Sequence, residues 1–181
     1  MQISVFGLGY VGVVLAACLA DNGHQVTGVD VNPTKIEIIQ QGRSPIIEKG
    51  LDELVRKGID SRKLFASSDT QKAVMGSDLS FICVGTPSNG NGNIDLKYVE
   101  RVCEQIGEAL AEKSDYHVIV LRSTMLPGST EELVIPTLEK ASGKKAGVDF
   151  GVCFNPEFLR EGSSIEDFYN PPFTKIGRAH V

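Results

Sequence analysis

The feature that most constrains the fold is the run GLGYVG at residues 7–12, close to the N-terminus. It follows an apolar stretch, residues 3–6, that predicts a buried strand, and it opens a helical pattern over residues 10–23. Glycines spaced in this way between a strand and a helix are typical of a dinucleotide-binding turn. The first glycine permits a tight bend, the second lets the backbone approach a pyrophosphate, and the third lets the helix pack on the strand. The first candidate cofactor-binding residues are therefore Gly7, Gly9 and Gly12.

A second apolar stretch, residues 25–30, ends in Asp30, about 20 residues past the last glycine, where a ribose-binding carboxylate is expected. Such a carboxylate would accept hydrogen bonds from the ribose hydroxyls and would repel a 2′-phosphate, which favours NAD over NADP. Lys35 follows on the next predicted helix. It is either a balancing charge near the ribose and phosphates or an ordinary solvated helix charge.

The rest of the chain alternates short apolar runs with longer helical patterns, which is typical of a parallel sheet covered by helices. We expect further strands at 64–68, 79–85 and 117–124, and a last strand and loop at 149–158. Helices are expected at 32–42, 51–58, 69–77 and 95–113, and a turn and helix at 126–143. Asn32 and Asp69 are expected to cap their helices. The predicted fold class is α/β, a Rossmann-like, doubly wound, mainly parallel sheet.

Composition and charge exclude several partners. The net charge is −5, and no basic run is dense enough to neutralise a row of phosphates, so nucleic acid is not expected to bind. No window approaches the roughly 20 apolar residues that cross a bilayer, and the N-terminus lacks the pattern of a signal peptide. We therefore expect a cytoplasmic protein without a membrane partner. The cysteines show no C-x-x-C pair, which suggests neither a zinc site nor a disulfide, and we expect buried thiols at Cys18, Cys83, Cys103 and Cys153.

Three loops follow predicted strands, where a doubly wound sheet binds its ligands. Thr86 and Thr124 could present hydroxyls to a cofactor or could only satisfy loop backbone. In the third loop, FNPEFLREG, Glu157 and Glu161 could serve acid/base chemistry in a partly dry pocket, or could be surface glutamates. The spacing alone does not decide between these interpretations.

Several longer motifs carry a family resemblance: GLGYVG, VD at 29–30, SPIIEKGLDELV, FICVGTPS, RSTMLPG and NPEFLREG. In this order and at these separations they closely resemble the UDP-glucose/GDP-mannose dehydrogenase family of nucleotide-sugar 6-dehydrogenases, from Met1 to about Ile176. Within the family, the segments KKAGVDFGV and NPPFT look more like the GDP-mannose branch than the UDP-glucose branch.

The resemblance implies oxidation of the C6 alcohol of a nucleotide-linked hexose to a carboxylate, with two NAD⁺ reduced in turn and a cysteine that holds the intermediate covalently. Carried over residue by residue, it implies cofactor contacts at Tyr10, Val11, Asp30, Lys35, Thr86 and Thr124. It also implies that Thr124 orients the catalytic water and that Glu157 acts as acid or base. The implied substrate contacts are Phe158, Leu159, Arg160 and Glu161.

The sequence departs from the family in one large respect. The nucleophile of the family lies in a G-G-x-C-x-x-K-D segment that does not occur here, and the connecting helix and the sugar-nucleotide domain are absent too. We therefore expect residues 1–177 to be the NAD-binding half of a two-domain, homo-oligomeric enzyme, inactive alone, and Arg178 to Val181 to be a non-native tail. The alternatives are a UDP-glucose enzyme, a non-catalytic dinucleotide-binding module and a dehydrogenase of the β-hydroxyacid type.

Overall fold

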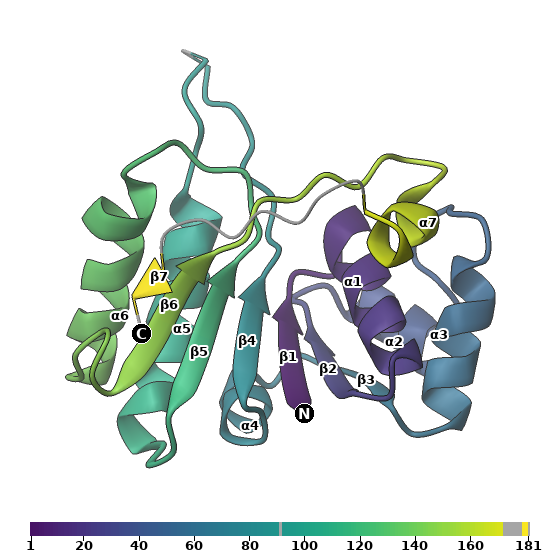
Figure 1. Cartoon of the computed structure of the whole chain (residues 1–181), viewed down its shortest axis with the longest axis horizontal. Helices are drawn as coiled ribbons and strands as arrows, with labels where there is room; N and C mark the ends of the chain where they lie inside the picture. The colour runs from purple at the N-terminus through teal and green to yellow at the C-terminus, as the bar shows by residue number, and fades with distance from the viewer. Residues whose placement is uncertain (91, 172–178, 181) are drawn as a thin grey trace.

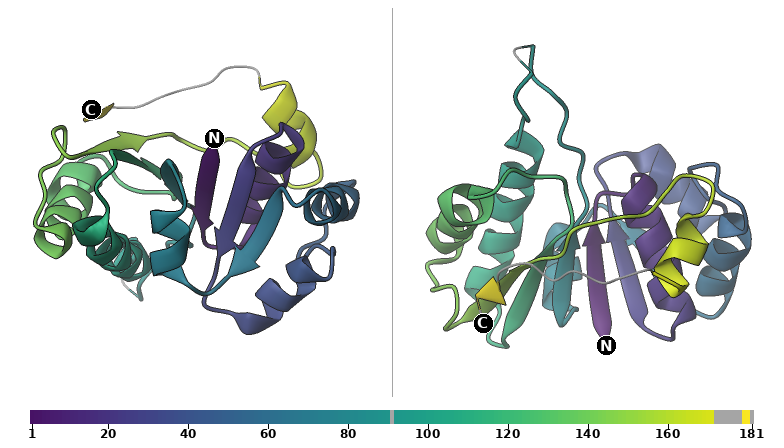
Figure 2. Two further views of the ribbon diagram at one scale, coloured as in Figure 1. Left: turned by 90° about the horizontal axis from the view of Figure 1, so that it is seen from below. Right: turned by 45° about the horizontal axis from the view of Figure 1, so that its top comes forward.

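A twisted sheet with helices on both faces forms the centre of the molecule (Figures 1 and 2). In the computed structural model, which describes residues 1–90, 92–171 and 179–180, the strand order is β3-β2-β1-β4-β5-β6-β7. Strands β1 to β6 are parallel, and β7 pairs antiparallel with β6, which confirms the predicted Rossmann-like, mainly parallel sheet. The strands are β1 (Gln2–Phe6), β2 (Gln25–Val29), β3 (Leu64–Ser67), β4 (Leu79–Ile82), β5 (His117–Leu121), β6 (Phe150–Phe154) and β7 (Ala179–His180).

Helices α2 (Pro33–Gln40) and α4 (Thr70–Met75) begin where the predicted capping residues place them. The side chain of Asn32 accepts a hydrogen bond from the Thr34 amide at 3.0 Å, and Asp69 accepts one from the Lys72 amide at 2.9 Å. These bonds satisfy amides that lack a partner inside the helix. The helices of the described residues are α1 (Tyr10–Asp21), α2 (Pro33–Gln40), α3 (Leu51–Asp60), α4 (Thr70–Met75), α5 (Lys97–Glu112), the π-helix η1 (Thr130–Val134), α6 (Ile135–Ser142) and α7 (Ser164–Tyr169).

The alternation of side chains along β1 divides the core into two layers. Ile3 and Val5 pack into one buried cluster with residues of α1 and α3, whereas Phe6 packs into a second cluster with residues of α5 and α6. Successive side chains of a strand point to opposite faces, so one strand contributes to both layers. Because β2 and β4 lie on either side of β1, the chain order reverses there, and the carboxyl ends of these strands flank a crevice.

Some local expectations differ from the structure. The helical pattern expected over residues 126–143 starts as the π-helix η1, which no side chain caps. Helix α7 was not predicted, since it is only six residues long and its apolar residues show no extended periodicity. Half of the expected non-native tail, Arg178 and Val181, lies outside the described residues, and Ala179 and His180 form β7.

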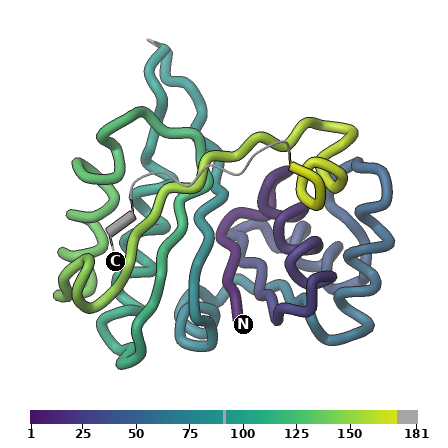
Figure 3. Tube along the Cα trace, viewed as in Figure 1, coloured from purple at the N-terminus to yellow at the C-terminus, as the bar shows by residue number. Residues whose placement is uncertain are grey.

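After β6 the chain crosses the carboxyl ends of the strands. Residues 155–163, the crossing segment, run from β6 over the top of the sheet to α7, and α7 packs beside α1 (Figures 1 and 3). This path carries the NPEFLREG motif from one half of the sheet to the other. None of the described helices has the length and apolar character needed to cross a membrane.

Candidate dinucleotide-binding site

The three glycines of the turn differ in what an added Cβ atom would meet. Gly7 has φ of +93°, and a Cβ there would lie 2.9 Å from the carbonyl oxygen of Cys83. A Cβ on Gly12 would lie 1.8 Å from the carbonyl oxygen of Gly7. A Cβ on Gly9, in contrast, would meet nothing within 4 Å. The turn therefore needs Gly7 and Gly12 for its own geometry, whereas Gly9 leaves open space in front of the helix, as a bound pyrophosphate requires.

The open space lies at the N-terminus of α1. The residue at the N-cap is Gly9, no side chain caps the first turn, and that turn contains no acidic residue. The amides at this end of a helix lack intrahelical acceptors and carry the positive end of the helix dipole. The end of α1 is thus suited to bind the pyrophosphate of a dinucleotide.

Asp30 is held at the same end of the sheet by contacts with the glycine turn and with the residue that precedes α2. Its carboxylate accepts hydrogen bonds from the amides of Leu8 at 2.7 Å and Asn32 at 2.9 Å. Lys35 forms an ion pair with it at 3.5 Å, and the Asp30 side chain is only 10% exposed. The carboxylate is therefore fixed beside the glycine turn, and Lys35 is a balancing charge at the predicted ribose site rather than an isolated solvated one.

A cleft of about 490 Å³ joins these features. It is lined by Gly7 and Gly9 of the turn, by Asp30 and Lys35, and by Tyr98 and Arg101 of α5. The contribution of α5 was missed in the sequence analysis, because its residues are remote in sequence and show no motif of their own. The uncapped helix end, the open space at Gly9 and the fixed carboxylate together fit a dinucleotide.

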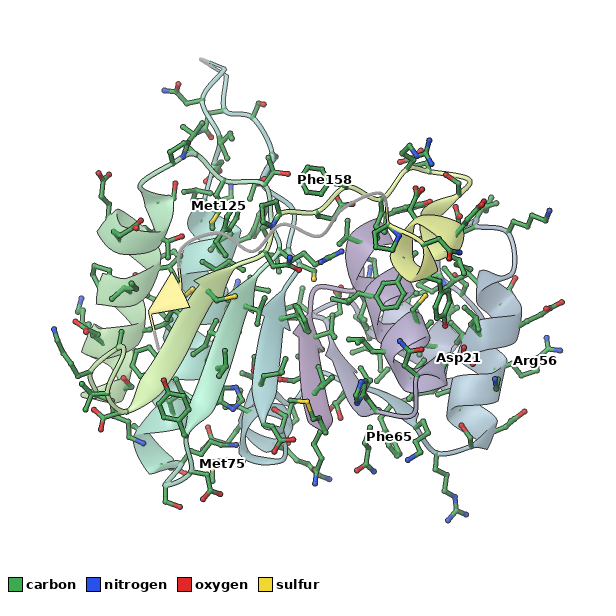
Figure 4. The ribbon with its side chains drawn as sticks, in the orientation of Figure 1. Asp21, Arg56, Phe65, Met75, Met125 and Phe158 are labelled. Atoms are coloured by element: carbon green, nitrogen blue, oxygen red, sulfur yellow. The ribbon has the colours of Figure 1, made fainter. Side chains whose placement is uncertain are left out.

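A second hollow of about 460 Å³ lies against β1, β2, β3 and α4, and its lining includes Phe65. Figure 4 places Phe65 at the opposite end of the molecule from Phe158, which lies above the carboxyl ends of the strands. This hollow contains neither the glycine turn nor the motif residues. The cleft at the turn is therefore the candidate site.

The two threonine loops are joined above β4 and β5. The hydroxyl of Ser123 donates to the carbonyl oxygens of Val84 at 2.7 Å and Ile82 at 3.3 Å. Thr86 is half-buried just beyond Gly85 of the cleft, and Thr124 is exposed. The structure thus brings both loops to the predicted end of the sheet, and cofactor contacts by Thr86 and Thr124 stay predictions.

The crossing segment exposes some motif residues and anchors others. Phe158 is 49% exposed (Figure 4), Glu161 is exposed, and Leu159 packs against the core cluster beneath α1. Glu157 is half-buried, and its carboxylate accepts a hydrogen bond from the amide of Leu159. Arg160 forms an ion pair with Asp167 of α7 at 2.6 Å. Glu157 and Glu161 therefore lie on one anchored segment.

None of the four cysteines is suited to act as a nucleophile. Cys18, Cys83 and Cys103 are buried, and burial raises the pKa of each thiol to about 12. Cys153 is half-buried, and burial raises its pKa as well. Because the thiolate is the reactive form, these thiols are structural.

Glu48 was not singled out in the sequence analysis. It lies in the loop SPIIEKG before α3, and its carboxylate accepts hydrogen bonds from Tyr10 and from the backbone of residues 162 and 164. The sequence indicated this loop only as part of the longer family motif SPIIEKGLDELV, and nothing in the sequence indicates what Glu48 contacts.

Comparison with known protein families finds one that matches nearly the whole chain. Residues 1–180 match the UDP-glucose/GDP-mannose dehydrogenase family, NAD binding domain. The chain belongs to this family. Its site is accordingly an NAD site, in agreement with the carboxylate at Asp30.

Similar proteins agree with this membership. GDP-mannose 6-dehydrogenase of Pseudomonas aeruginosa is 58% identical over 177 residues, and UDP-glucose 6-dehydrogenase AglM of Haloferax volcanii is 39% identical over the same length. Each alignment covers 98% of this chain and 41% of the relative.

Solved structures show the same likeness in three dimensions. A ternary complex of GDP-mannose dehydrogenase from Pseudomonas aeruginosa superimposes with a TM-score of 0.97 at 57% identity, covering 98% of this chain and 41% of that one. A UDP-glucose dehydrogenase from Pyrobaculum islandicum gives 0.90 at 44% identity, covering 97% and 40%. The chain therefore spans about two fifths of the length of the relatives that it matches.

Proposed function

We propose that this chain is the cofactor-binding half of an enzyme that converts GDP-mannose, two NAD⁺ and water into GDP-mannuronate, two NADH and protons. The observation that carries the proposal is the 58% identity with a GDP-mannose 6-dehydrogenase across nearly the whole chain. The lower identity, 39%, with a UDP-glucose enzyme supports GDP-mannose as the substrate.

NAD⁺ would accept the hydride from the C6 carbon, and the residues of this chain would hold it in place. The amides of Tyr10 and Val11, at the start of α1, would donate to the pyrophosphate, and Asp30 would accept from the ribose hydroxyls. Thr86 and Thr124 would contact the cofactor from the loops after β4 and β5.

The crossing segment would face the sugar nucleotide. Glu157 would move protons to and from the reacting oxygen, and Thr124 would orient the water that is consumed. Phe158 and Arg160 are exposed residues of the segment, and they would contact substrate together with Leu159 and Glu161. In the proposed complete enzyme, residues 1–177 form the cofactor domain, a further domain supplies the nucleophilic cysteine, and the assembly is a cytoplasmic homo-oligomer.

The proposal is tested in a hybrid enzyme in which residues 1–177 replace the aligned segment of the Pseudomonas aeruginosa relative. We expect the hybrid to form two NADH per GDP-mannose and to be much slower with UDP-glucose. The chain alone should form no NADH, because three of its four thiols are buried and burial raises the pKa of all four. Faster turnover of UDP-glucose by the hybrid would instead support the UDP-glucose alternative, and NAD⁺ binding without any turnover would support a non-catalytic module.

The ribose assignment has its own test. Asp30→Ala in the hybrid should weaken NAD⁺ binding about 10-fold to 100-fold, because a buried carboxylate that accepts charge-assisted hydrogen bonds is removed. Binding of the sugar nucleotide should change much less. Calorimetric titration of each ligand measures this, and equal losses for both ligands would contradict the ribose role.

A further inference from the structure

One carboxylate joins three segments that are far apart in the sequence. Glu48 Oε2 accepts hydrogen bonds from the Tyr10 hydroxyl at 2.5 Å and from the Gly162 amide at 2.8 Å. Its Oε1 accepts from the Ser164 amide at 3.0 Å. The Gly162 amide also lies 3.2 Å from the Tyr10 hydroxyl oxygen. Glu48 thus connects the first residue of α1 to the end of the crossing segment.

The contacts require an ionised carboxylate. Burial alone would raise the pKa of Glu48, but hydrogen bonds from Tyr10, Gly162 and Ser164 outweigh it and hold the pKa below its ordinary value. Burial and the bond to Glu48 raise the pKa of the Tyr10 hydroxyl, which therefore stays a donor. Donors approach both carboxylate oxygens, and an amide could not accept all of these bonds because its nitrogen is only a donor.

Backbone geometry and apolar packing around Glu48 support these hydrogen bonds. Gly162 has φ of +88°, a conformation that disfavours other residues, so the crossing segment turns sharply where Glu48 holds it. Tyr10, Ile46, Leu159 and Ile165 all pack against the core cluster beneath α1. The hydrogen bonds are therefore backed by apolar contacts between the same segments.

The position of this connection relates it to the site. Tyr10 is the first residue of α1, at the helix end proposed to bind the pyrophosphate, and its hydroxyl donates to Glu48, which is not among the residues that line the cleft. Gly162 directly follows Glu161 and lies five residues after Glu157. A displacement of Gly162 would therefore move both glutamates relative to the glycine turn.

We propose that Glu48 is a positioning residue that fixes the crossing segment, and with it Glu157 and Glu161, relative to the dinucleotide turn. The inference rests on the proposed function for the roles of those two glutamates. Glu48 acts through the hydroxyl of Tyr10 and the amides of Gly162 and Ser164, and it touches neither cofactor nor substrate.

The contacts are tested on the 181-residue chain itself by hydrogen exchange without added ligand. Glu48→Ala should speed exchange of the Gly162 and Ser164 amides about 10-fold or more, with the α1 amide of Val13 unchanged. Glu48→Gln keeps one acceptor oxygen and should give an intermediate rate, which general unfolding would not produce. The matched control is Glu53→Gln on exposed α3 surface, which should match the parent. Parent-like exchange at Gly162 and Ser164 in both Glu48 variants overturns the proposal.

The positioning role is tested in the hybrid enzyme by comparing turnover with cofactor affinity. Glu48→Ala should lower kcat with GDP-mannose about 10-fold or more, because small displacements of reacting groups are costly. The Kd of NAD⁺ should change by less than about 3-fold, and the Glu53→Gln hybrid should match the parent. An unchanged kcat overturns the role. A parent hybrid that oxidises no sugar nucleotide refutes the proposed function, and the role of Glu48 in catalysis is refuted at the same time. Hydrogen exchange on the 181-residue chain separately decides whether Glu48 holds the crossing segment.

Discussion

The glycine turn and the crossing segment both lie at the carboxyl ends of the strands, but different kinds of contact hold them. The turn is fixed by sterics: Gly7 and Gly12 have no room for a Cβ, and the obstructing atoms are backbone. The crossing segment is fixed by polar side chains from other elements, including Glu48 and Asp167. The turn is thus sensitive to added volume, whereas the segment is sensitive to lost charge.

The two regions also differ in how far apart in the sequence their contacting residues lie. The contacts of the turn and of the Asp30 carboxylate come from residues 2–35, apart from Cys83 and Val84. The crossing segment is anchored to Glu48, and the far end of α7 is anchored by a hydrogen bond from Tyr169 to Asp21 at 2.7 Å. A short motif can therefore define the cofactor site, but it cannot place the residues of the crossing segment.

The largest effect is expected at the third glycine. Gly12→Ala should destabilise the domain by about 3 kcal/mol and abolish measurable NAD⁺ binding, since the Cβ would overlap the Gly7 carbonyl oxygen. The gain in helix propensity, about 1 kcal/mol, is too small to compensate. Thermal unfolding and NAD⁺ titration measure this. Parent-like stability would show that the turn is not held by sterics.

The second glycine should separate binding from folding. Gly9→Ala should leave stability within about 1 kcal/mol of the parent, because a Cβ there meets open space. NAD⁺ affinity should fall by about 10-fold or more, since that space would be taken by the pyrophosphate. The same two measurements apply. Unchanged affinity would mean that the dinucleotide does not approach Gly9.

The smallest effect concerns charge in the crossing segment. Arg160 holds the pKa of Asp167 at about 2, so its stabilising contribution is complete above the ordinary pKa of about 4 and is lost as pH falls through about 2. We expect pepsin to cleave near Phe158 several-fold faster at pH 2 than at pH 4, after correction with an unfolded peptide of the same sequence.

Asp167→Asn should show the faster cleavage already at pH 4, because the ion pair is absent at any pH. Mass spectrometry locates the cut. If pepsin cleaves within α1 before it cleaves near Phe158, the difference between the two regions is reversed, because the crossing segment is then more firmly held than the glycine turn and its helix.

The elements near strong local signals could be predicted from sequence with small errors. Asn32 and Asp69 cap their helices as expected, and each glycine of the turn has the geometry that its predicted role requires. Helix α7 and the contribution of Tyr98 to the cleft could not be predicted. A six-residue helix has too little periodicity, and an exposed tyrosine on a helix carries no sign of the cleft that it faces.

The sequence by itself determined the strand, turn, helix and carboxylate at the glycine turn, because these depend on residues close together in the chain. It also determined the family, through the order and spacing of motifs along nearly the whole chain. Only the tertiary structure decided that the crossing segment returns over the sheet to α1 and that Glu48 holds it there. Those contacts join residues 114 and 116 positions apart, and such pairing follows from the packing of whole elements rather than from any local pattern.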